Sequence, residues 1–208
     1  MLATALVAPA GGATQPLAGR IFVVDPGHGV RYPDGSPLNV GAVGPDGIAE
    51  AKVTLAVGED LAHLLRAAGS HVVLTRSYAA PYRIGSVIRV DNRARAALAN
   101  DLGATAFVAI HADASTDPSR RGTSVFWLRS NSVALAQAMR AQLATLGMGE
   151  SEFRARDLAV TNEARVPAVL VELGFVSNPQ QERILATPAF QERAAHALYE
   201  AVVRTFGR

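Results

Sequence analysis

Short apolar runs alternate along this chain with longer segments of helical periodicity, and this alternation leaves few folds open to it. Five runs are expected to be strands: "RIFVVD", "HVVLT", "TAFVAI", "TSVFWL" and "PAVLVEL". Each run is apolar almost throughout rather than at every second residue, which is typical of strands that are buried on both faces. The pattern therefore predicts a single-domain α/β fold, with a mostly parallel twisted sheet flanked by helices on both faces.

The segments between these runs have the spacing of amphipathic helices. In Ala49–Ala68 the apolar residues recur at intervals of three and four, and Gly69 follows as a natural C-cap. Asn178-Pro179 and Thr187-Pro188 each join an N-cap residue to a proline, which is favoured at the first position of a helix. Three further helices are expected over Val87–Leu102, Val133–Leu146 and Pro188–Phe206.

The composition excludes several classes of function. The chain has no cysteine, which excludes disulfides, thiolate metal ligands and a cysteine nucleophile. Its net charge is +2 over 208 residues, which gives little support to a role in nucleic-acid binding. No apolar stretch approaches the roughly 20 residues of a transmembrane helix. The serines lack the GxSxG context of a serine hydrolase, so that chemistry is not expected.

Residues 1–19 differ from the rest of the chain, because they are small, mostly apolar and uncharged. Two interpretations stay open for this leader. It is either the remnant of a signal peptide, with its apolar region and small-residue cleavage site, or a disordered or added segment. Residues 20–208 contain all the expected strands and helices and are interpreted as one domain.

Polar side chains follow three of the expected strands at the point where each strand ends. His28 follows the first strand within "DPGHG", His111 ends "FVAIHAD", and Glu172 lies in "AVLVELGF". Glu50 opens the first helix, on the face that its apolar residues share. Open α/β sheets bind ligands at the carboxyl ends of their strands. We therefore expect two imidazoles and two carboxylates to meet at one edge of the sheet.

This set of side chains suits a catalytic zinc site, which uses three protein ligands, often two His and one Glu, and a further carboxylate as general base. Each residue also has a simpler interpretation. Glu50 is an acidic residue of the kind favoured at a helix N-terminus, and His111 could be a hydrogen-bonded core histidine. Glu172 is harder to explain in this way, because a carboxylate flanked by core residues is costly to bury without a partner.

Four segments of the chain resemble, in order, the signatures of the zinc-dependent N-acetylmuramoyl-L-alanine amidases of the amidase-3 family. They are "VVDPGHG", "GAVGPDGIAEAKVTLAVGEDLAHLLRAAGSHVVLTR", "RAALANDLGATAFVAIHADAS" and "PAVLVELGFVSNPQQERIL", within a resemblance over about Arg20 to Phe206. The resemblance implies one zinc ion per chain with His28, Glu50 and His111 as its ligands. It also implies that Glu172 is the catalytic base.

The resemblance further implies a periplasmic or secreted cell-wall hydrolase, or autolysin, with peptidoglycan or muropeptides as substrate. The bond cleaved would be the amide between the lactyl group of N-acetylmuramic acid and the L-alanine of the stem peptide. Glu172 would take the proton of the attacking water and return it to the leaving amine. We expect such a protein to act as a monomer.

The substrate contacts are less well defined by the sequence. Many members of the family carry an arginine five residues before the proline of "PAVLVE", where this chain has Asn162. Arg165, Arg154 or Arg156 could serve instead. The stretch "GMGESEFRARDLAVTNEARV" has no apolar stripe of helical period. We therefore expect a short hairpin or loop there, rather than a helix that covers the zinc site.

Two other functions stay open at this point. One is a different zinc hydrolase, of carboxypeptidase or deacetylase type, and the other is a peptidoglycan-binding regulator without catalytic activity. The presence of all three expected ligands and the expected base argues against the regulator. His63 and His71 have no partners at useful positions and are assigned no role. His196 and Glu200 have the spacing of a metal pair, but within an amphipathic terminal helix they are expected to be surface or core residues.

Overall fold

The structure is a computed structural model that describes residues 15–29, 39–76 and 92–208. Most of the leader, most of the loop after His28 and the first residues of the helix expected over Val87–Leu102 lie outside these ranges. Within them, the molecule is built on a six-stranded sheet with the strand order β2-β1-β3-β6-β4-β5.

Four neighbouring strands of this sheet, β2, β1, β3 and β6, are parallel to one another. β4 is antiparallel to β6, and β5 is parallel to β4. The carboxyl ends of the four parallel strands therefore share one edge of the sheet with the amino ends of β4 and β5. The strands are β1 (Ile21–Pro26), β2 (His71–Leu74), β3 (Ala106–Asp113), β4 (Thr123–Trp127), β5 (Glu150–Ala155) and β6 (Ala168–Phe175).

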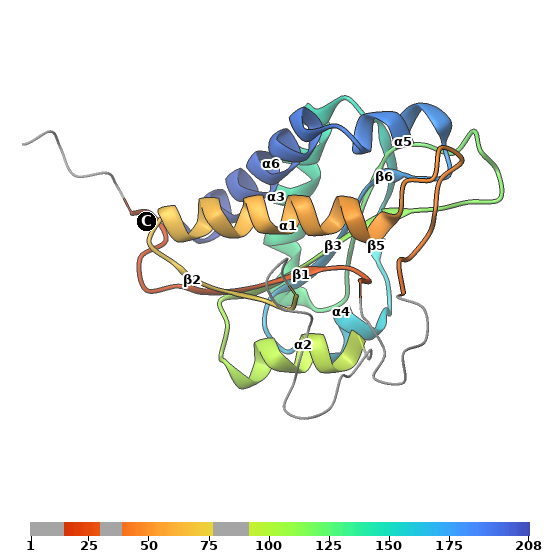
Figure 1. Cartoon of the computed structure of the whole chain (residues 1–208). Coiled ribbons are helices and arrows are strands. Elements are labelled where there is room, and N and C mark those ends of the chain that lie inside the picture. Colours follow the sequence, from red (N-terminus) through yellow and green to blue (C-terminus); the bar gives the residue numbers. More distant parts are fainter. Residues whose placement is uncertain (1–14, 30–38, 77–91) are drawn as a thin grey trace, which may run out of the picture.

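Helices cover both faces of the sheet (Figure 1). One face carries α1 (Glu50–Ala67), α3 (Val133–Leu143) and α6 (Pro188–Phe206), and the other carries α2 (Asn92–Asp101) and α4 (Ala159–Glu163). The remaining helical elements are α5 (Pro179–Leu185) and two 3-10 turns, Ser130–Ser132 and Ala144–Leu146. No helix in the described ranges is both long enough and apolar enough to cross a bilayer.

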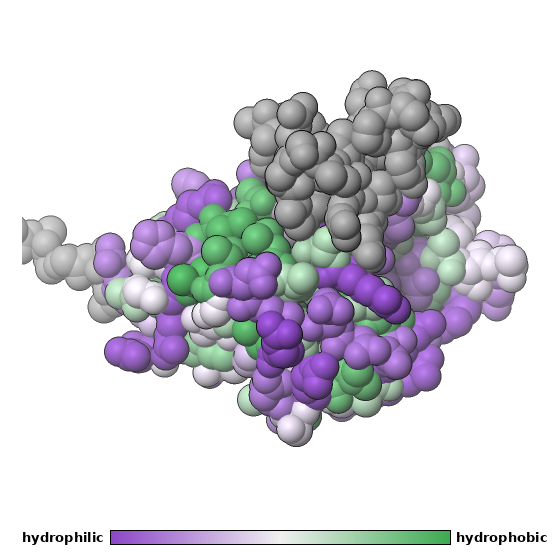
Figure 2. Space-filling view, turned by 90° about the horizontal axis from the view of Figure 1, so that it is seen from below, coloured by the Kyte–Doolittle hydropathy of each residue, from purple (hydrophilic) through white to green (hydrophobic). Residues whose placement is uncertain are grey.

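Two hydrophobic cores follow from this arrangement, one on each side of the sheet. The larger core packs alternate residues of the strands against α1, α3 and α6, and includes the inward residues Val53, Val57, Leu61 and Leu65 of α1. The smaller core lies under α2 and α4 and contains the other set of strand residues, such as Phe107 and Phe126. Figure 2 shows the molecule from this second side, where hydrophilic side chains cover much of the surface outside the region drawn in grey.

The five predicted strands and the amphipathic helices are confirmed, with small shifts at their ends. The helix expected over Val133–Leu146 is α-helical to Leu143 and then tightens into a 3-10 turn, after which Gly147 adopts a left-handed φ of 73°. Pro188–Phe206 is confirmed with both ends as predicted, and Thr187 caps it by accepting a hydrogen bond from the backbone of Phe190.

The prediction of a hairpin or loop after Gly147 was wrong. Glu150–Ala155 is strand β5, which joins the sheet as an edge strand parallel to β4, and Ala159–Glu163 forms the short helix α4. β5 is polar because an edge strand pairs on one side only and buries little of its surface. Its sequence therefore lacks the continuous apolar run by which the other strands were recognised.

Candidate active site

His28 lies in a turn just beyond β1, and its surroundings explain why both of its neighbours are glycines. A Cβ atom on Gly27 would lie 2.4 Å from the imidazole ring of His111, and one on Gly29 would lie 2.4 Å from the guanidinium carbon of Arg76. His28 itself has a φ of 60°, in the left-handed region that residues other than glycine rarely adopt. The turn brings the imidazole rings of His28 and His111 together, with centroids 5.0 Å apart.

Two buried arginines hold this turn in place. Arg95 forms an ion pair with Asp25, with a nitrogen–oxygen distance of 2.7 Å, and donates a hydrogen bond to the backbone carbonyl of His28 at 3.0 Å. Arg76 donates to the carbonyls of the two residues that precede His28, each at 2.8 Å. A residue in a strained conformation persists only where its surroundings fix it, and these contacts do so for His28.

Glu50, the first residue of α1, lies between the two imidazoles. Its Oε2 atom is 3.0 Å from Nε2 of His28, and its Oε1 atom is 2.9 Å from Nδ1 of His111. Each oxygen also accepts a backbone hydrogen bond, Oε2 from Ala42 at 3.2 Å and Oε1 from Ala112 at 3.0 Å. The side chain is therefore directed at the two histidines, which the simpler interpretation of Glu50 as a helix-terminus residue does not explain.

The three side chains offer a set of donor atoms that fits one metal ion. One donor from each of His28, Glu50 and His111 lies within 4.8 Å of the others, and no other group of this kind was found in the described part of the chain. Nδ1 of His28 is 3.2 Å from Oδ1 of Asn39, so Nε2 is the ring nitrogen that would bind a metal ion. Outer partners of this kind orient metal-binding histidines. Two imidazoles and a carboxylate, without thiolates, form a donor set used by catalytic zinc.

The residues of this cluster change one another's protonation. Burial would raise the pKa of Glu50, but the hydrogen bonds from His111 and His28 hold that pKa well below its usual value. Burial disfavours the charged form of His28, but the hydrogen bond and negative charge of Glu50 outweigh it and raise the pKa of His28 above its usual 6.5. Binding of a metal ion here therefore competes with protonation of His28.

Glu172 lies on β6 directly beside His111, its partner in the register of the two strands. Its Oε2 atom is buried and has no hydrogen-bond partner among the described residues. Burial raises the pKa of Glu172 well above its usual range, and the negative charges of Glu50 and Asp113 raise it further. A carboxyl group with a raised pKa, next to a set of metal donors, is suited to accept a proton and to return it.

Two of the residues predicted to contact substrate, Arg154 and Arg156, come from β5 and its C-terminal end. The guanidinium carbon of Arg156 is 5.0 Å from the ring centre of Phe126, and that of Arg154 is 5.9 Å from the same ring. Both arginines are exposed, and the charge of Arg156 acts to lower the pKa of Glu172 against the effect of burial. The structure therefore brings Arg156 into the electrostatic neighbourhood of Glu172.

The other two predicted contacts, Asn162 and Arg165, lie at α4 and just after it. Both residues are exposed, and their backbone carbonyls accept hydrogen bonds from Arg129 and Asn131, at 2.8 Å and 3.0 Å. These bonds fix the backbone of this segment rather than the two side chains. Substrate binding by Asn162 or Arg165 stays a prediction.

Several residues that shape the site were not recognised in the sequence. Asn39 orients the imidazole of His28, Arg95 binds its backbone carbonyl, and Asp25 forms an ion pair with Arg95. One signal was available, because Arg95 interrupts the inward face of its helix next to Ala96 and Ala99, where a charge needs a buried partner. The identity of that partner depends on the fold and could not be read from spacing.

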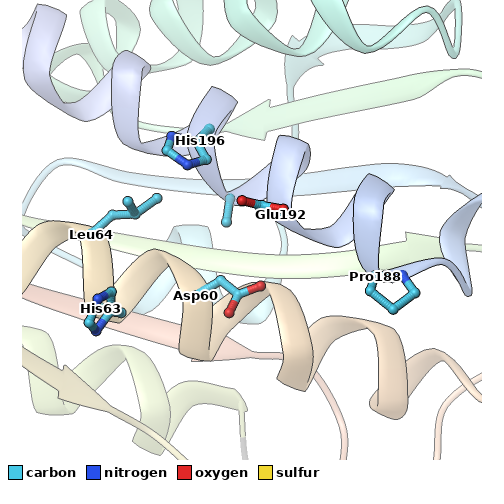
Figure 3. A pocket seen from close by; sticks show the side chains of 7 residues that line it. Asp60, His63, Leu64, Pro188, Glu192 and His196 are labelled. Carbon is cyan, nitrogen blue, oxygen red and sulfur yellow. The ribbon is translucent and has the colours of Figure 1, made fainter.

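A hollow lies away from this edge of the sheet, between α1 and α6 (Figure 3). Its volume is about 300 Å³, and its titratable residues are Asp60, His63, Glu192 and His196. His63 and His196, neither of which was expected to bind a metal, both line this hollow. Their donor atoms do not form a group spaced for a metal ion, so the hollow is assigned no chemistry.

Comparison with known proteins relates most of the chain to one family. The family model described as N-acetylmuramoyl-L-alanine amidase matches residues 22–204. Among curated proteins, the probable cell wall amidase LytH of Staphylococcus epidermidis is 27% identical over 194 residues. That match covers 93% of this chain but 60% of LytH, so the chain spans about three fifths of the length of this relative.

Solved structures resemble this one over nearly the whole fold. The amidase AmiC2 of Nostoc punctiforme has a TM-score of 0.77 and 27% identity, with 90% of this chain and 97% of that chain covered. The catalytic domain of CwlV from Bacillus (Paenibacillus) polymyxa var. colistinus has a TM-score of 0.77 and 30% identity, with 89% and 97% covered. The fold class predicted from the alternating strands and helices is confirmed by both.

Proposed function

Since this chain belongs to the N-acetylmuramoyl-L-alanine amidase family, we propose that it hydrolyses the amide between the lactyl group of N-acetylmuramic acid and the L-alanine of a peptidoglycan stem peptide. The observation that carries the proposal is the position of Glu172, a carboxylate with an unpartnered buried oxygen, beside the cluster of His28, Glu50 and His111. A protein that only binds peptidoglycan does not need a carboxylate that is costly to bury in the sheet. Hydrolysis of an amide needs a base at this position.

We also propose that His28, Glu50 and His111 hold one zinc ion per chain. The donor set supports this, because it matches the His and Glu ligands of catalytic zinc sites and leaves a position open. When bound, zinc would lower the pKa of a water molecule and polarise the carbonyl of the scissile amide. The transfer of protons is left to the protein.

Glu172 carries out both proton transfers in this proposal. It first removes a proton from the attacking water, as a general base. It then donates that proton to the nitrogen of L-alanine as the bond between carbon and nitrogen breaks. A higher pKa makes a carboxylate a stronger base, so the raised pKa of Glu172 favours the first of these two transfers.

The stem peptide carries carboxylates, which the exposed side chains of Arg154, on β5, and Arg156, just after it, are suited to bind. We propose that Arg156, and beside it Arg154, bind these carboxylates, because both lie over Phe126 on the side of Glu172. Arg165 and Asn162 would contact the peptide further from the zinc ligands. We also propose that the protein acts as a monomer, in the periplasm or outside the cell, where peptidoglycan lies.

The deciding experiment is product analysis by mass spectrometry after digestion of purified peptidoglycan, with and without a metal chelator. We expect intact stem peptides with a free N-terminal L-alanine, and loss of this product in the presence of chelator. Glu172→Gln is the matched control, because it should keep zinc and lose roughly 10²–10⁴-fold in turnover. Release of a C-terminal amino acid or of acetate would instead show a carboxypeptidase or a deacetylase, and near-normal turnover by Glu172→Gln would refute the role of the base.

A further inference from the structure

Ser124, on β4, lies directly opposite Glu172 in the antiparallel pair of β4 and β6. Directly opposite residues of such a pair project from the same face of the sheet, with Cβ atoms about 4.5–5.5 Å apart. The register of β3 and β6 extends this row to His111. His111, Glu172 and Ser124 therefore lie side by side on three adjacent strands, with the catalytic base of the proposed function in the middle.

Ser124 and Glu172 each have a buried polar atom without a hydrogen-bond partner. These atoms are Oγ of Ser124 and Oε2 of Glu172, and neither has a partner among the described residues. Ser124 is only 1% exposed, so bulk water does not reach it. Most buried polar groups in proteins are hydrogen-bonded, and the occurrence of two exceptions on directly opposite residues requires an explanation.

The next residue in this row, Glu152, already forms ion pairs with two arginines. Ser124 pairs on its other side with Glu152 of β5, whose carboxylate lies 2.5 Å from Arg154 and 3.6 Å from Arg120. Glu172 is therefore the neighbour of Ser124 whose carboxylate still has an oxygen to be satisfied.

We propose that Ser124 is a positioning residue for Glu172, an inference that rests on the proposed amidase function. A rotation of the Ser124 side chain directs its hydroxyl to Oε2 of Glu172. This bond fixes the carboxylate with Oε1 toward the attacking water, so that the proton is taken up and released at Oε1 alone. A hydroxyl suits this position because it can donate to Oε2 both when the carboxylate is ionised and when the proton lies on Oε1, so the same bond serves both states of the base.

The test compares Ser124→Ala with Ser124→Thr, which restores a hydroxyl, and with the matched control Ser132→Ala. Ser132 is also 1% exposed, and its Oγ accepts a hydrogen bond from the backbone of Ala168 at 2.9 Å, at the far end of β6. The readouts are kcat and KM on a soluble muramoyl-peptide, zinc content, and the midpoint of thermal unfolding.

For Ser124→Ala we expect kcat to fall by about tenfold or more, as for loss of a hydrogen bond to a charged group, with KM and zinc content unchanged. Its thermal midpoint should stay near that of the wild type, because the resting structure loses no hydrogen bond. Ser124→Thr should recover most of kcat, whereas Ser132→Ala should lower the thermal midpoint and leave kcat unchanged.

An unchanged kcat in Ser124→Ala, measured beside an active wild type, would overturn this inference and leave the amidase function standing. A loss of kcat that is accompanied by loss of zinc, or by a fall in thermal midpoint like that of Ser132→Ala, would also overturn it, because Ser124 would then be structural. An inactive zinc-loaded wild type would overturn the proposed function, and this inference with it.

Discussion

At the scale of single residues, Gly27 is constrained by His111 rather than by its own backbone. An added Cβ would overlap the imidazole of His111, so we expect Gly27→Ala to displace that ring and to weaken zinc binding by roughly 10–100-fold, as for a lost outer partner of a metal ligand. Competition with a chromophoric chelator measures this. The control is Gly103→Ala, after α2, because a Cβ there meets nothing within 4 Å, although the φ of 56° adds backbone strain. Equal zinc affinities in the two variants would contradict the prediction.

Glu172 lowers the stability of the fold where it is ionised. Burial raises its pKa in the folded protein above the value in the unfolded chain, so the folded state binds the extra proton more tightly. The protonated carboxyl group therefore stabilises the fold at a pH below the pKa of Glu172 in the unfolded chain. This stabilisation is lost as the pH rises through the pKa of Glu172 in the folded protein. We expect Glu172→Gln, which cannot ionise, to raise the thermal midpoint of the metal-free protein more at pH 7 than at pH 4. A gain that is the same at both pH values would show that the carboxylate is not destabilised by burial.

The four proposed site residues could be predicted from the sequence, because three of them stand out at strand ends and Glu50 at the start of a helix. An imidazole or a carboxylate directly after an apolar run has few simple explanations, as His111 and Glu172 illustrate. Asn39, Arg95 and Ser124 could not be predicted in the same way. Their roles depend on which distant residue the fold brings opposite them, and spacing along the chain carries no such information.

At the scale of secondary-structure elements, α5 fixes the loop that leads into α1 and so into Glu50. Glu182 of α5 is fully buried, and its two oxygens accept hydrogen bonds from the backbones of Asp46 and Ile48, at 2.8 Å and 2.9 Å. A Cβ on Gly44 would lie 2.3 Å from this carboxylate, so the loop and α5 are closely packed. Glu182 therefore helps to set the position of Glu50 from a separate element.

Glu182→Ala removes the shared acceptor of two partly buried N–H groups, so we expect it to cost about 1–3 kcal/mol in the free energy of unfolding and to weaken zinc binding. Glu182→Gln keeps one acceptor and should lose less. The neighbouring ion pair of Arg183 with Asp46 is exposed, so Arg183→Ala should change neither quantity measurably. Chemical denaturation and zinc titration of the three variants check this. Normal zinc affinity in a destabilised Glu182→Ala protein would mean that the loop does not position Glu50.

The helices and strands differ in how well they could be predicted from the sequence. Strands buried on both faces and helices with an apolar stripe were predicted, because burial selects their residues directly. β5 and α4 were missed, since an edge strand and a five-residue helix bury few side chains and leave little pattern. The missed strand matters for the site, because it carries Arg154 and ends beside Arg156.

At the scale of the whole molecule, the sheet order brings together at one edge residues that lie far apart in the chain. β1 and β3 are neighbours, and β6 follows β3, so His28, His111 and Glu172 arrive on successive strands. α1 then contributes Glu50 from its first turn, since it begins at the same edge (Figure 1). The alternating pattern of the sequence predicted this class of fold, but the order of the strands required the structure.

Whether the protein requires an activator depends on whether a segment of its own chain covers the proposed zinc ligands. The stretch between α3 and β6 is where a helix covering the zinc site was considered, and Gly147–Arg165 instead forms β5 and α4. β5 pairs with β4 in the sheet. α4 is five residues long and buries Val160 and Thr161 on the side of α2. Neither element has a further apolar face to lay over the ligands.

We therefore expect the isolated, zinc-loaded protein to cleave a soluble muramoyl-peptide without a partner protein, at least about a hundredfold faster than Glu172→Gln. The CwlV catalytic domain in the same assay verifies the substrate. If that domain is active while this protein, with one zinc per chain, becomes active only after a partner is added, the site is closed at rest.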